Sequence, residues 1–176
     1  SIPKHVKVII EPFVGNGNLL NFKNIKELSI EKYDIDPRSY DTIKKDTLMH
    51  PPSYKNKFVI TNPPYLARNK NSDKTLYDLY STNDLYKCFI KQLINDPPLG
   101  GIVIIPLNFW CSIRKQDISL RKCFLKKFNI DKLNIFEEKV FSDTSYSVCS
   151  FQFTYNVENN DSINTTIYPI KKNIIF

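Results

Sequence analysis

The sequence predicts an α/β fold in which a mostly parallel sheet ends in an antiparallel hairpin. Short apolar runs bounded by turn residues recur along the chain, and polar or helical-looking segments separate several of them. The connection between the last two runs is too short for a helical crossover. Alternation of this kind is typical of parallel sheets covered by helices. The chain has 176 residues, the length of one domain, and we expect a single domain over residues 1–176.

Six apolar runs are the main predicted strands. A shorter strand is expected around Thr42–Lys44, and Glu137–Ser147 forms the connection of the hairpin. The polar segment Asn156–Asn164 is predicted to be a loop. The main strands are Val6–Ile10, Leu28–Tyr33, Phe58–Thr61, Gly101–Pro106, Leu133–Phe136 and Val148–Tyr155.

Two segments are predicted to be helices. Asn83–Asn95 has apolar side chains at helical spacing along one face. This helix should stop at Asp96–Pro98, because proline cannot continue it. The second helix is expected at about Asp117–Lys127. The stretch between Gly17 and Leu28 is too short for a full helix plus a loop.

The composition favours a polyanionic partner. The formal net charge is +7, although charge alone fixes neither the fold nor a sequence preference. The four cysteines show no CxxC pair and no metal-ligand spacing with histidine, so we expect reduced thiols and no metal site. No apolar run has the length of a membrane span, and no signal peptide is visible. A soluble intracellular protein without a membrane partner is expected.

The first motif, Glu11–Gly17, reads Glu-Pro-Phe-Val-Gly-Asn-Gly and follows the strand Val6–Ile10. In a doubly wound sheet, a glycine-rich turn at the carboxyl end of a strand lets a ligand approach the backbone, and an acid beside it can receive an ammonium group. Two of the four glycines of the chain lie in this turn, which strengthens the interpretation as a ligand site. A plain tight turn is the alternative.

Two further acids follow predicted strands. Asp34, in the segment Asp34-Ile35-Asp36-Pro37, ends the second strand, where a carboxylate can accept hydrogen bonds from the two vicinal hydroxyls of a ribose. Asp46, followed by Thr47, comes after the short strand, and its carboxylate can accept a hydrogen bond from an adenine amino group. The alternative is that these aspartates are solvated residues that form turns.

The tetrapeptide Asn62-Pro63-Pro64-Tyr65 follows the strand Phe58–Thr61 and carries the chemical prediction. The lone pair of an amino group on adenine is drawn into the ring, so the nitrogen is a poor nucleophile until acceptors hold its hydrogens. The Asn62 side-chain oxygen and the Pro63 carbonyl can be these acceptors, in a turn that the prolines stiffen. Tyr65 offers a flat face for stacking the base, and in-line methyl transfer then needs mainly positioning. The alternative is a proline-stiffened loop without a catalytic role.

The order of these motifs resembles that of class I S-adenosylmethionine-dependent methyltransferases, most closely the gamma-ordered DNA N6-adenine type with an Asn-Pro-Pro-Tyr motif. The matching segments are Glu11–Gly17, Asp34–Pro37, Asp46–Thr47, Asn62–Tyr65, Asp84–Phe89 and Gly100–Pro106. The resemblance implies a Rossmann-like sheet and a catalytic site made of Asn62, Pro63, Pro64 and Tyr65. It implies that S-adenosyl-L-methionine is bound by Glu11, Pro12, Phe13, Gly15, Gly17, Asp34, Ile35, Asp46, Thr47, Asn62 and Phe89. For Phe89, a place in the core is an equally good interpretation.

The resemblance also implies contacts to DNA. Phe141, between the last two predicted strands, resembles the aromatic residue that stacks on a flipped-out adenine opposite the catalytic tyrosine, and Tyr146 is its competitor. Leu66–Thr82 is predicted to be a flexible basic loop whose Arg68 and Lys70 meet phosphates around the extruded nucleotide. The alternatives are packing within the hairpin for the aromatic residues and a solvated loop for the basic segment.

Other functions remain compatible with these residues. Asn-Pro-Pro-Tyr also serves methyltransferases that modify adenine in RNA or a glutamine amide in protein, and the basic loop favours DNA. A degenerate methyltransferase fold that acts as a binding subunit is the second alternative, against which the intact Asp34, Asp46 and Asn62–Tyr65 argue. We expect residues 1–176 to lack a segment that caps the cofactor and a target-recognition domain, which a longer protein or a separate subunit would supply.

Overall fold

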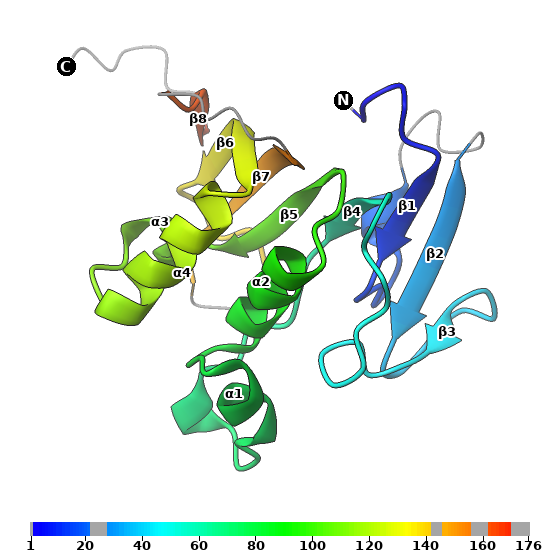
Figure 1. Ribbon diagram of the computed structural model, residues 1–176, viewed down its shortest axis with the longest axis horizontal. Coiled ribbons are helices and arrows are strands. Elements are labelled where there is room, and N and C mark those ends of the chain that lie inside the picture. The colour runs from blue at the N-terminus through cyan, green and yellow to red at the C-terminus, as the bar shows by residue number, and fades with distance from the viewer. Residues whose placement is uncertain (1, 22–27, 142–145, 156–161, 170–176) are drawn as a thin grey trace.

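The computed structural model describes residues 2–21, 28–141, 146–155 and 162–169, and Figure 1 shows how its elements are arranged. The α-helices of the described residues lie between β4 and β6 in the chain. The strands are β1 (Val8–Glu11), β2 (Ser29–Asp34), β3 (Ile43–Lys44), β4 (Phe58–Thr61), β5 (Gly100–Pro106), β6 (Phe128–Phe136), β7 (Val148–Tyr155) and β8 (Thr165–Tyr168). The helices are α1 (Thr75–Tyr80), α2 (Leu85–Asn95), α3 (Asn108–Cys111) and α4 (Lys115–Leu125), with 3-10 helices η1 (Asn18–Leu20) and η3 (Arg68–Lys70).

The strands form one sheet in the order β3-β2-β1-β4-β5-β7-β6-β8. The neighbours from β3 to β5 pair in parallel, whereas β7 runs antiparallel to both β5 and β6. The predicted fold class, a mostly parallel sheet with an antiparallel hairpin, is confirmed. The order reverses between β1 and β4, because the chain first builds outward from β1 to β3 and then continues on the other side. Open α/β sheets bind ligands at such a point, beyond the carboxyl ends of the strands.

Strand β8 was not predicted from the sequence. This strand pairs in parallel with the end of β6, so that Leu133 lies opposite Thr165 and Phe136 opposite Tyr168. It is a short edge strand whose side chains alternate between exposed and half-buried, so its apolar pattern is weak. Of the predicted loop Asn156–Asn164, residues 156–161 lie outside the described part of the chain, and residues 162–164 are irregular.

Helix α2 packs its apolar side against the sheet. Phe89, Ile90 and Leu93 are fully buried in a core that includes Val103 of β5. Burying each such side chain stabilises the fold by about 1.5–3 kcal/mol relative to leaving it exposed. The helix ends at Asn95, before the prolines that were expected to stop it. The predicted amphipathic helix is confirmed.

Helix α4 lies beside α2 on the same face of the sheet (Figure 1). Its bounds differ slightly from the predicted Asp117–Lys127, because the chain already enters β6 at Phe128. Phe124 of this helix meets Phe128 and Phe153, with ring centroids 4.7 and 5.3 Å from its own. Aromatic side chains of the antiparallel strands therefore fix where α4 packs.

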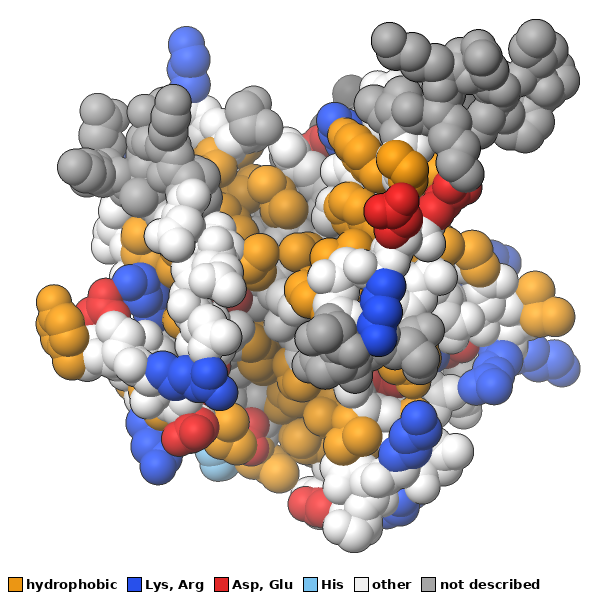
Figure 2. Space-filling view, turned by 180° about the vertical axis from the view of Figure 1, so that it is seen from behind, with side chains coloured by type: hydrophobic (Ala, Val, Ile, Leu, Met, Phe, Trp, Pro, Cys, Tyr) orange, Lys and Arg blue, Asp and Glu red, His pale blue; other side chains and the backbone are white. Residues whose placement is uncertain are grey.

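The opposite face of the sheet carries a smaller apolar cluster. Figure 2 shows hydrophobic side chains gathered in a hollow along the middle of this face. In the described part of the chain, no α-helix contributes to the cluster. η1 is a single short turn after Gly17, as expected for so short a connection, and residues 22–27 lie outside the described residues. The buried members are Val6, Ile9, Leu20, Phe58 and Ile60.

The segment Leu66–Thr82, predicted to be a flexible loop, instead contains η3 and α1. Tyr77 of α1 is buried, and its hydroxyl donates to the Leu66 carbonyl at 3.0 Å. The Asp73 side chain accepts a hydrogen bond from the Thr75 amide at 2.8 Å at the start of α1. A helix this short shows no clear apolar period, so the prediction of a loop was wrong.

No helix in the described part of the chain is long and apolar enough to cross a membrane. Within the same residues, no group of three or more His, Cys, Asp or Glu side chains is placed to hold a metal ion. All four cysteines are free thiols; Cys88 and Cys149 are buried, and Cys111 and Cys123 are exposed.

Candidate active site

The sheet brings three of the predicted motifs to one edge. β1 pairs in register with β2 through Glu11 and Lys32, and β4 pairs with β1 through Ile9 and Phe58. The carboxyl ends of β1, β2 and β4 therefore lie next to one another at the switch point of the sheet. Glu11 and Asp34 end their strands, and Asn62 directly follows β4.

The glycine-rich turn is bound to the end of β2. Gly15 and Gly17 have φ values of 53° and 75°, a left-handed conformation that suits glycine. The Gly15 amide donates to a carboxylate oxygen of Asp34 at 2.7 Å, and the Val14 amide donates to the Tyr33 carbonyl at 3.1 Å. The other Asp34 oxygen accepts from the Asp36 amide at 2.8 Å. Two motifs that are separate in the sequence thus form one structural unit.

Glu11 is the buried acid of this unit. Its side chain is only 1% exposed, and neither carboxylate oxygen has a well-aligned hydrogen-bond partner among the described residues. Burial raises the pKa of Glu11 from 4.5 to about 8, against a smaller lowering by the Thr61 hydroxyl and the Phe13 amide. A buried carboxylate without partners gains strongly from a cationic ligand.

The segment after β3 closes the same edge. The Thr47 hydroxyl donates to the Pro12 carbonyl at 2.9 Å, which ties this segment to the glycine-rich turn. The Asp46 side chain accepts hydrogen bonds from the Leu48 and Met49 amides at 3.1 and 3.0 Å, so it also stabilises its own turn. Ile35, beyond the end of β2, is 63% exposed. An exposed apolar side chain beside these acids suits a ligand with an apolar face.

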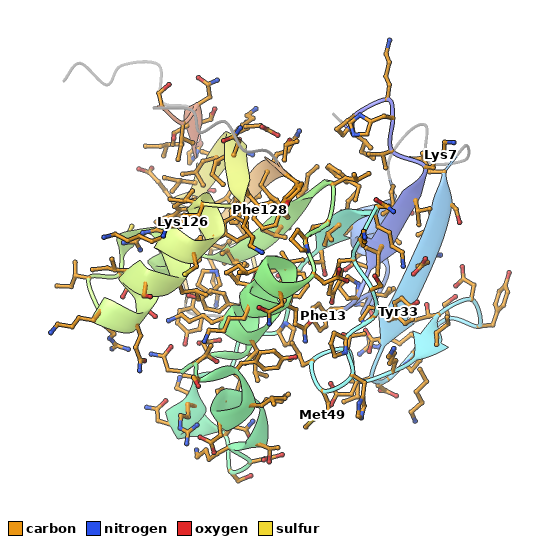
Figure 3. The ribbon with its side chains drawn as sticks, viewed as in Figure 1. Lys7, Phe13, Tyr33, Met49, Lys126 and Phe128 are labelled. Carbon is orange, nitrogen blue, oxygen red and sulfur yellow. The ribbon has the colours of Figure 1, made fainter. Side chains whose placement is uncertain are left out.

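Aromatic side chains pack beneath Phe13 of the glycine-rich turn, on the side of the core. The rings of Phe13 and Phe89 meet edge to face at 5.3 Å, and Tyr54 approaches Phe89 at 5.9 Å. Figure 3 shows Phe13 and Tyr33 at this end of the sheet, with Met49 beyond them. Phe89 has no exposed surface, which favours its interpretation as a core residue beneath Phe13. Its contact with a cofactor stays a prediction.

Gln92 of α2 was not predicted from the sequence as a site residue. It is 3% exposed, and its amide nitrogen lies 3.0 Å from the carbonyls of both Thr47 and Leu48. Its side-chain oxygen accepts from the Tyr54 hydroxyl at 3.0 Å. Gln92 thus joins the segment after β3 to α2. A lone glutamine on an apolar helix face is the only signal in the sequence, and that signal does not identify the partner.

The Asn62–Tyr65 turn follows β4 and is held by its own tyrosine. Pro63 is buried and Pro64 exposed. The Tyr65 hydroxyl lies 2.7 Å from the Ile104 carbonyl on β5 and also contacts the Asn62 side-chain oxygen. Because the hydroxyl has one proton, it donates to one of these oxygens at a time. Burial raises the pKa of Tyr65, so this proton stays in place across the physiological range.

The chain beyond Tyr65 is attached to the start of α2. The Leu66 amide donates to the Asp84 side chain at 3.2 Å, and the Leu85 amide donates to the Leu66 carbonyl at 3.2 Å. Asp84 is 7% exposed and has an extended backbone. The predicted helix start at Asn83 was therefore slightly wrong, because Asn83 and Asp84 pair with the segment after the turn before the helix begins at Leu85.

The basic side chains near the turn are partly committed to the fold. Arg68 pairs with Asp78 at 2.7 Å, and the Lys74 ammonium contacts the carbonyls of Arg68 and Asn71. These cations help to hold the segment around η3 and α1. Lys70 is exposed.

A cavity of about 600 Å³ opens beside the turn, and we call it the basic cavity. Tyr86 forms part of its wall and packs edge to face against Tyr65, with ring centroids 6.2 Å apart. Of the two aromatic residues predicted to stack on a base, Tyr146 lines this cavity and Phe141 does not. The lining residues are Ala67, Arg68, Asn69, Lys70, Lys74, Asn83, Asp84, Tyr86, Lys87, Pro106, Asn108, Arg114 and Tyr146.

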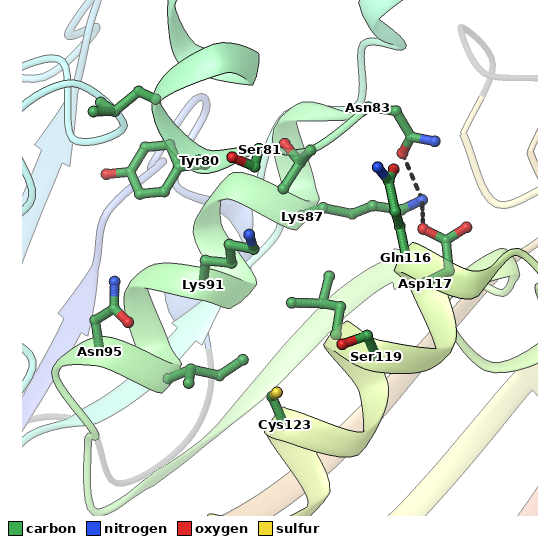
Figure 4. A pocket seen from close by; sticks show the side chains of 14 residues that line it. Tyr80, Ser81, Asn83, Lys87, Lys91, Asn95, Gln116, Asp117, Ser119 and Cys123 are labelled. Carbon is green, nitrogen blue, oxygen red and sulfur yellow. Dashed lines mark hydrogen bonds and ion pairs between the residues drawn. The ribbon is translucent and has the colours of Figure 1, made fainter.

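A second cavity, of about 570 Å³, lies between α1, α2 and α4. Figure 4 shows Lys87 in its wall, with its ammonium group bonded to Asn83 at 2.8 Å and Asp117 at 2.6 Å. None of the predicted catalytic or cofactor-binding residues lines this cavity. The candidate site therefore consists of the carboxyl ends of β1, β2 and β4 together with the basic cavity.

The comparison with protein families agrees with this geometry. A family model described as the Eco57I restriction-modification methylase matches residues 12–141. The chain belongs to this family. The predicted membership of the class I methyltransferases is thereby confirmed, and the Eco57I-family match includes the motifs from Pro12 to Tyr65 and the strands β2 to β6. Among curated proteins, none matches the sequence.

Solved structures share the fold of this Eco57I-family chain. A protein from Vibrio vulnificus described as a modification subunit of a type I restriction enzyme is 14% identical, with a TM-score of 0.73 over 97% of this chain and 44% of that one. A class I S-adenosylmethionine-dependent methyltransferase from Listeria monocytogenes is 13% identical, with a TM-score of 0.68 over 93% and 59%. The methyltransferase subunit of a type I restriction-modification system from Streptococcus thermophilus is 15% identical, with a TM-score of 0.61 over 87% and 40%. The chain thus spans between 40% and 59% of the length of these three relatives.

Proposed function

We propose that this chain transfers a methyl group from S-adenosyl-L-methionine to the N6 amino group of adenine in DNA. The observation that carries the proposal is the position of Asn62–Tyr65 at the end of β4, next to the acid that ends β1 and one strand away from the acid that ends β2. The family is described as a restriction-modification methylase, which supports methylation of DNA.

The residues at the sheet edge fit S-adenosyl-L-methionine. Glu11 is a buried carboxylate without a hydrogen-bond partner among the described residues, and it suits the ammonium group of the methionine part. Each Asp34 oxygen already accepts one hydrogen bond, and its remaining lone pairs suit the ribose hydroxyls. Asp46 would take the adenine amino group, and the exposed Ile35 its ring. When bound, this cofactor supplies a methyl group activated by a sulfonium.

Asn62 and Pro63 would prepare the target nitrogen. The Asn62 side-chain oxygen has two lone pairs, so it can accept a hydrogen from the adenine amino group even when Tyr65 donates to it. The Pro63 carbonyl would accept the second hydrogen. Holding both hydrogens favours a tetrahedral nitrogen whose lone pair points at the methyl group. The turn needs no covalent nucleophile, because positioning supplies most of the rate gain.

The target base would stack on Tyr65, whose ring is partly exposed and whose hydroxyl is anchored to β5. We propose Tyr146 or Phe141 as the opposing aromatic, with Tyr146 favoured because it lines the basic cavity. Arg68 and Lys70 would meet phosphates at the rim of this cavity, since an adenine inside a duplex must be extruded to react. Recognition of a sequence would come from a further domain or subunit.

A parallel transfer assay tests the proposal. The protein that contains this chain is given radiolabelled S-adenosyl-L-methionine with duplex DNA, ribosomal RNA and a release-factor protein, each in a separate reaction. The proposal expects label on DNA, recovered as N6-methyladenine after digestion to nucleosides, and no label with an Asn62→Ala variant. Label on the RNA or the protein alone would contradict it. Absence of cofactor binding in calorimetry, by a folded chain, would instead indicate a binding subunit.

A further inference from the structure

The basic cavity carries five cations and a single acid among its lining residues. The acid is Asp84, which is 7% exposed and already accepts a hydrogen bond from the Leu66 amide. Asp84 is therefore turned to the backbone that it holds, and it offers little counter-charge to the opening of the cavity. The cations are Arg68, Lys70, Lys74, Lys87 and Arg114.

Three of the five cations already have partners. Lys87 is nearly buried and pairs with Asp117, with the two side chains 4% and 5% exposed. Arg68 pairs with Asp78, and Lys74 is bound to backbone carbonyls.

Lys70 and Arg114 differ from these three. Both are exposed, and neither side chain forms an ion pair with the residues that the structure describes. Lys70 lies in η3, shortly after the catalytic turn, whereas Arg114 precedes α4. They reach the same cavity from two separate elements, so a ligand in the cavity can meet both.

The second cavity shows that this arrangement is not a general property of the helical face. Its acid, Asp117, pairs with Lys87, and Lys91 is the one other charged side chain among its lining residues (Figure 4). The two cavities share Asn83 and Lys87 as a common wall. Among the described lining residues, the cations with neither an ion pair nor a bond to backbone carbonyls are therefore Lys70 and Arg114 on the side of the wall that faces the catalytic turn, and Lys91 alone on the other side.

The position of the basic cavity, next to the catalytic turn, indicates which ligand its positive charge would bind. Ala67 of its wall lies two residues beyond Tyr65, and Pro106 lies two residues beyond Ile104, whose carbonyl holds the Tyr65 hydroxyl. The phosphodiester groups on either side of an adenine stacked on Tyr65 would lie at the opening of this cavity. Arginine binds phosphate through two parallel hydrogen bonds, and lysine binds it as a point charge.

We propose that Arg114 and Lys70 bind the two phosphodiester groups that flank the target adenine, with Arg114 the stronger contact. This inference rests on the proposed function, because it takes the occupant of the site to be a DNA strand. It adds a contact from the segment between α3 and α4, far in the sequence from the catalytic turn.

The test measures binding of a short DNA duplex that carries one unpaired adenine, since an unpaired base costs less to extrude. Arg114→Gln should weaken binding roughly tenfold, the loss expected for one charge-assisted contact. It should also lower the slope of log Kd against log salt by about 0.9. Lys70→Gln should act in the same direction with a smaller effect. Lys122→Gln is the matched control, because Lys122 is exposed on α4 and lines neither cavity.

Replacing a charged phosphodiester by a neutral analogue identifies which phosphate Arg114 contacts. Replacing either phosphodiester next to the unpaired adenine by a methylphosphonate should weaken binding by the wild type, and Arg114→Gln should make one of the two replacements silent. All variants must keep the melting temperature of the wild type, which is expected because the altered side chains are exposed.

An Arg114→Gln variant with unchanged affinity and salt slope would overturn the inference. A variant that still loses affinity at both methylphosphonates would do so as well. Equal competition by heparin, with no effect of the methylphosphonates, would also contradict it and indicate a general anion surface. If the Arg114→Gln variant methylates adenine normally and binds DNA with an unchanged Kd, this inference is wrong and the proposed function is unaffected. If the wild type binds DNA with the expected phosphate contacts but does not methylate it, the proposed function alone is wrong.

Discussion

The cofactor side of the candidate site and its target side are held together in different ways. On the cofactor side, hydrogen bonds from Gly15 and Val14 reach Asp34 and Tyr33, so the ends of two neighbouring strands bind each other. On the target side, the segment after Tyr65 is held by Asp84 and Tyr77, which belong to elements later in the chain. One side is made mainly by adjacent parallel strands, with Gln92 of α2 bound to the segment after β3, and the other mainly by helices packed on the sheet.

The two sides of the site should therefore differ in how well they tolerate substitutions in the helical layer. Parallel pairing of β1 with β2 and β4 places Glu11 and Asp34, which are predicted to bind the cofactor, wherever the sheet forms. The target side depends in addition on where α1, α2 and α4 pack. Changes within the helical layer should therefore disturb target binding and stability before they disturb cofactor binding.

Asn62→Ala should have the largest effect. It removes one of the two acceptors proposed to hold the amino hydrogens, and losing one such preorganised group costs on the order of a hundred- to a thousandfold in rate. Cofactor affinity should change only a few-fold, because Glu11 and Asp34 are untouched. Single-turnover transfer and calorimetry measure the two quantities. Wild-type turnover by the variant would refute the mechanism. Equal losses in transfer rate and cofactor affinity would contradict the proposed division into a cofactor side and a target side.

Lys87→Met should destabilise the helical layer strongly. It leaves Asp117 buried with only the Ser112 hydroxyl, which donates to it at 2.6 Å. Breaking one side of a buried pair costs about 3–5 kcal/mol. Urea unfolding of the cofactor-free protein measures this loss. The double variant Lys87→Met/Asp117→Leu should recover much of it, and a double variant as unstable as the single one would show that the charge is not the cause.

Asp34→Ala should weaken cofactor binding by roughly ten- to a hundredfold, since a charge-assisted hydrogen bond contributes about 1.5–3 kcal/mol. It removes the acceptor for the Gly15 amide as well as the proposed ribose contact. Asp36→Ala is the matched control, because it deletes the same charge from an exposed side chain close by. Equal effects of the two variants on the dissociation constant would favour solvated turn residues over a ribose site.

The raised pKa of Glu11 gives a pH-dependent prediction. A carboxyl whose pKa is about 8 in the folded protein and near 4.5 when unfolded favours folding while protonated, so its contribution to stability falls as pH rises between these values. At pH 7 most of the cofactor-free protein carries a neutral Glu11. Binding a cationic ligand should therefore release close to one proton.

Calorimetry in buffers with different ionisation enthalpies measures this release. Glu11→Gln is the control, because it keeps the size of the side chain and cannot ionise. The variant should bind the cofactor without releasing the proton, and its stability should change less between pH 5 and pH 8. The same proton release in both proteins would place the titrating group elsewhere.

The smallest effects should come from two tyrosines that touch each other. Tyr65→Phe removes a hydroxyl bonded to β5 and should cost about 1 kcal/mol of stability. Tyr86→Phe removes a buried hydroxyl that has no partner among the described residues, so it should be neutral or slightly stabilising. Thermal unfolding distinguishes the two. A loss in the Tyr86 variant equal to that of Tyr65 would mean that the hydroxyl is satisfied in solution.

The sequence predicted the strands of the sheet well and the connections less well. Parallel strands buried on both faces are continuous apolar runs, so β4 has the predicted bounds and β1 and β5 nearly so. The antiparallel β7 also has the predicted bounds and β2 nearly so, whereas β6 begins at Phe128 rather than at the predicted Leu133. α1, α3 and β8 were missed, because elements this short carry little periodic signal. The start of α2 was misplaced, because Asp84 is bonded to Leu66. Such a contact between distant residues leaves no mark in the local pattern.

By itself, the sequence determined the fold class, the family and the order of the motifs, since each motif is a short segment at the end of a strand. The tertiary structure alone decided which side chains share a space. Glu11 became a buried acid with no hydrogen-bond partner among the described residues, Gln92 a link between the segment after β3 and α2, and Arg114 a side chain that lines the cavity beside the Asn62–Tyr65 turn. Burial and charge at a site depend on every element packed around it, and the local sequence does not contain that information.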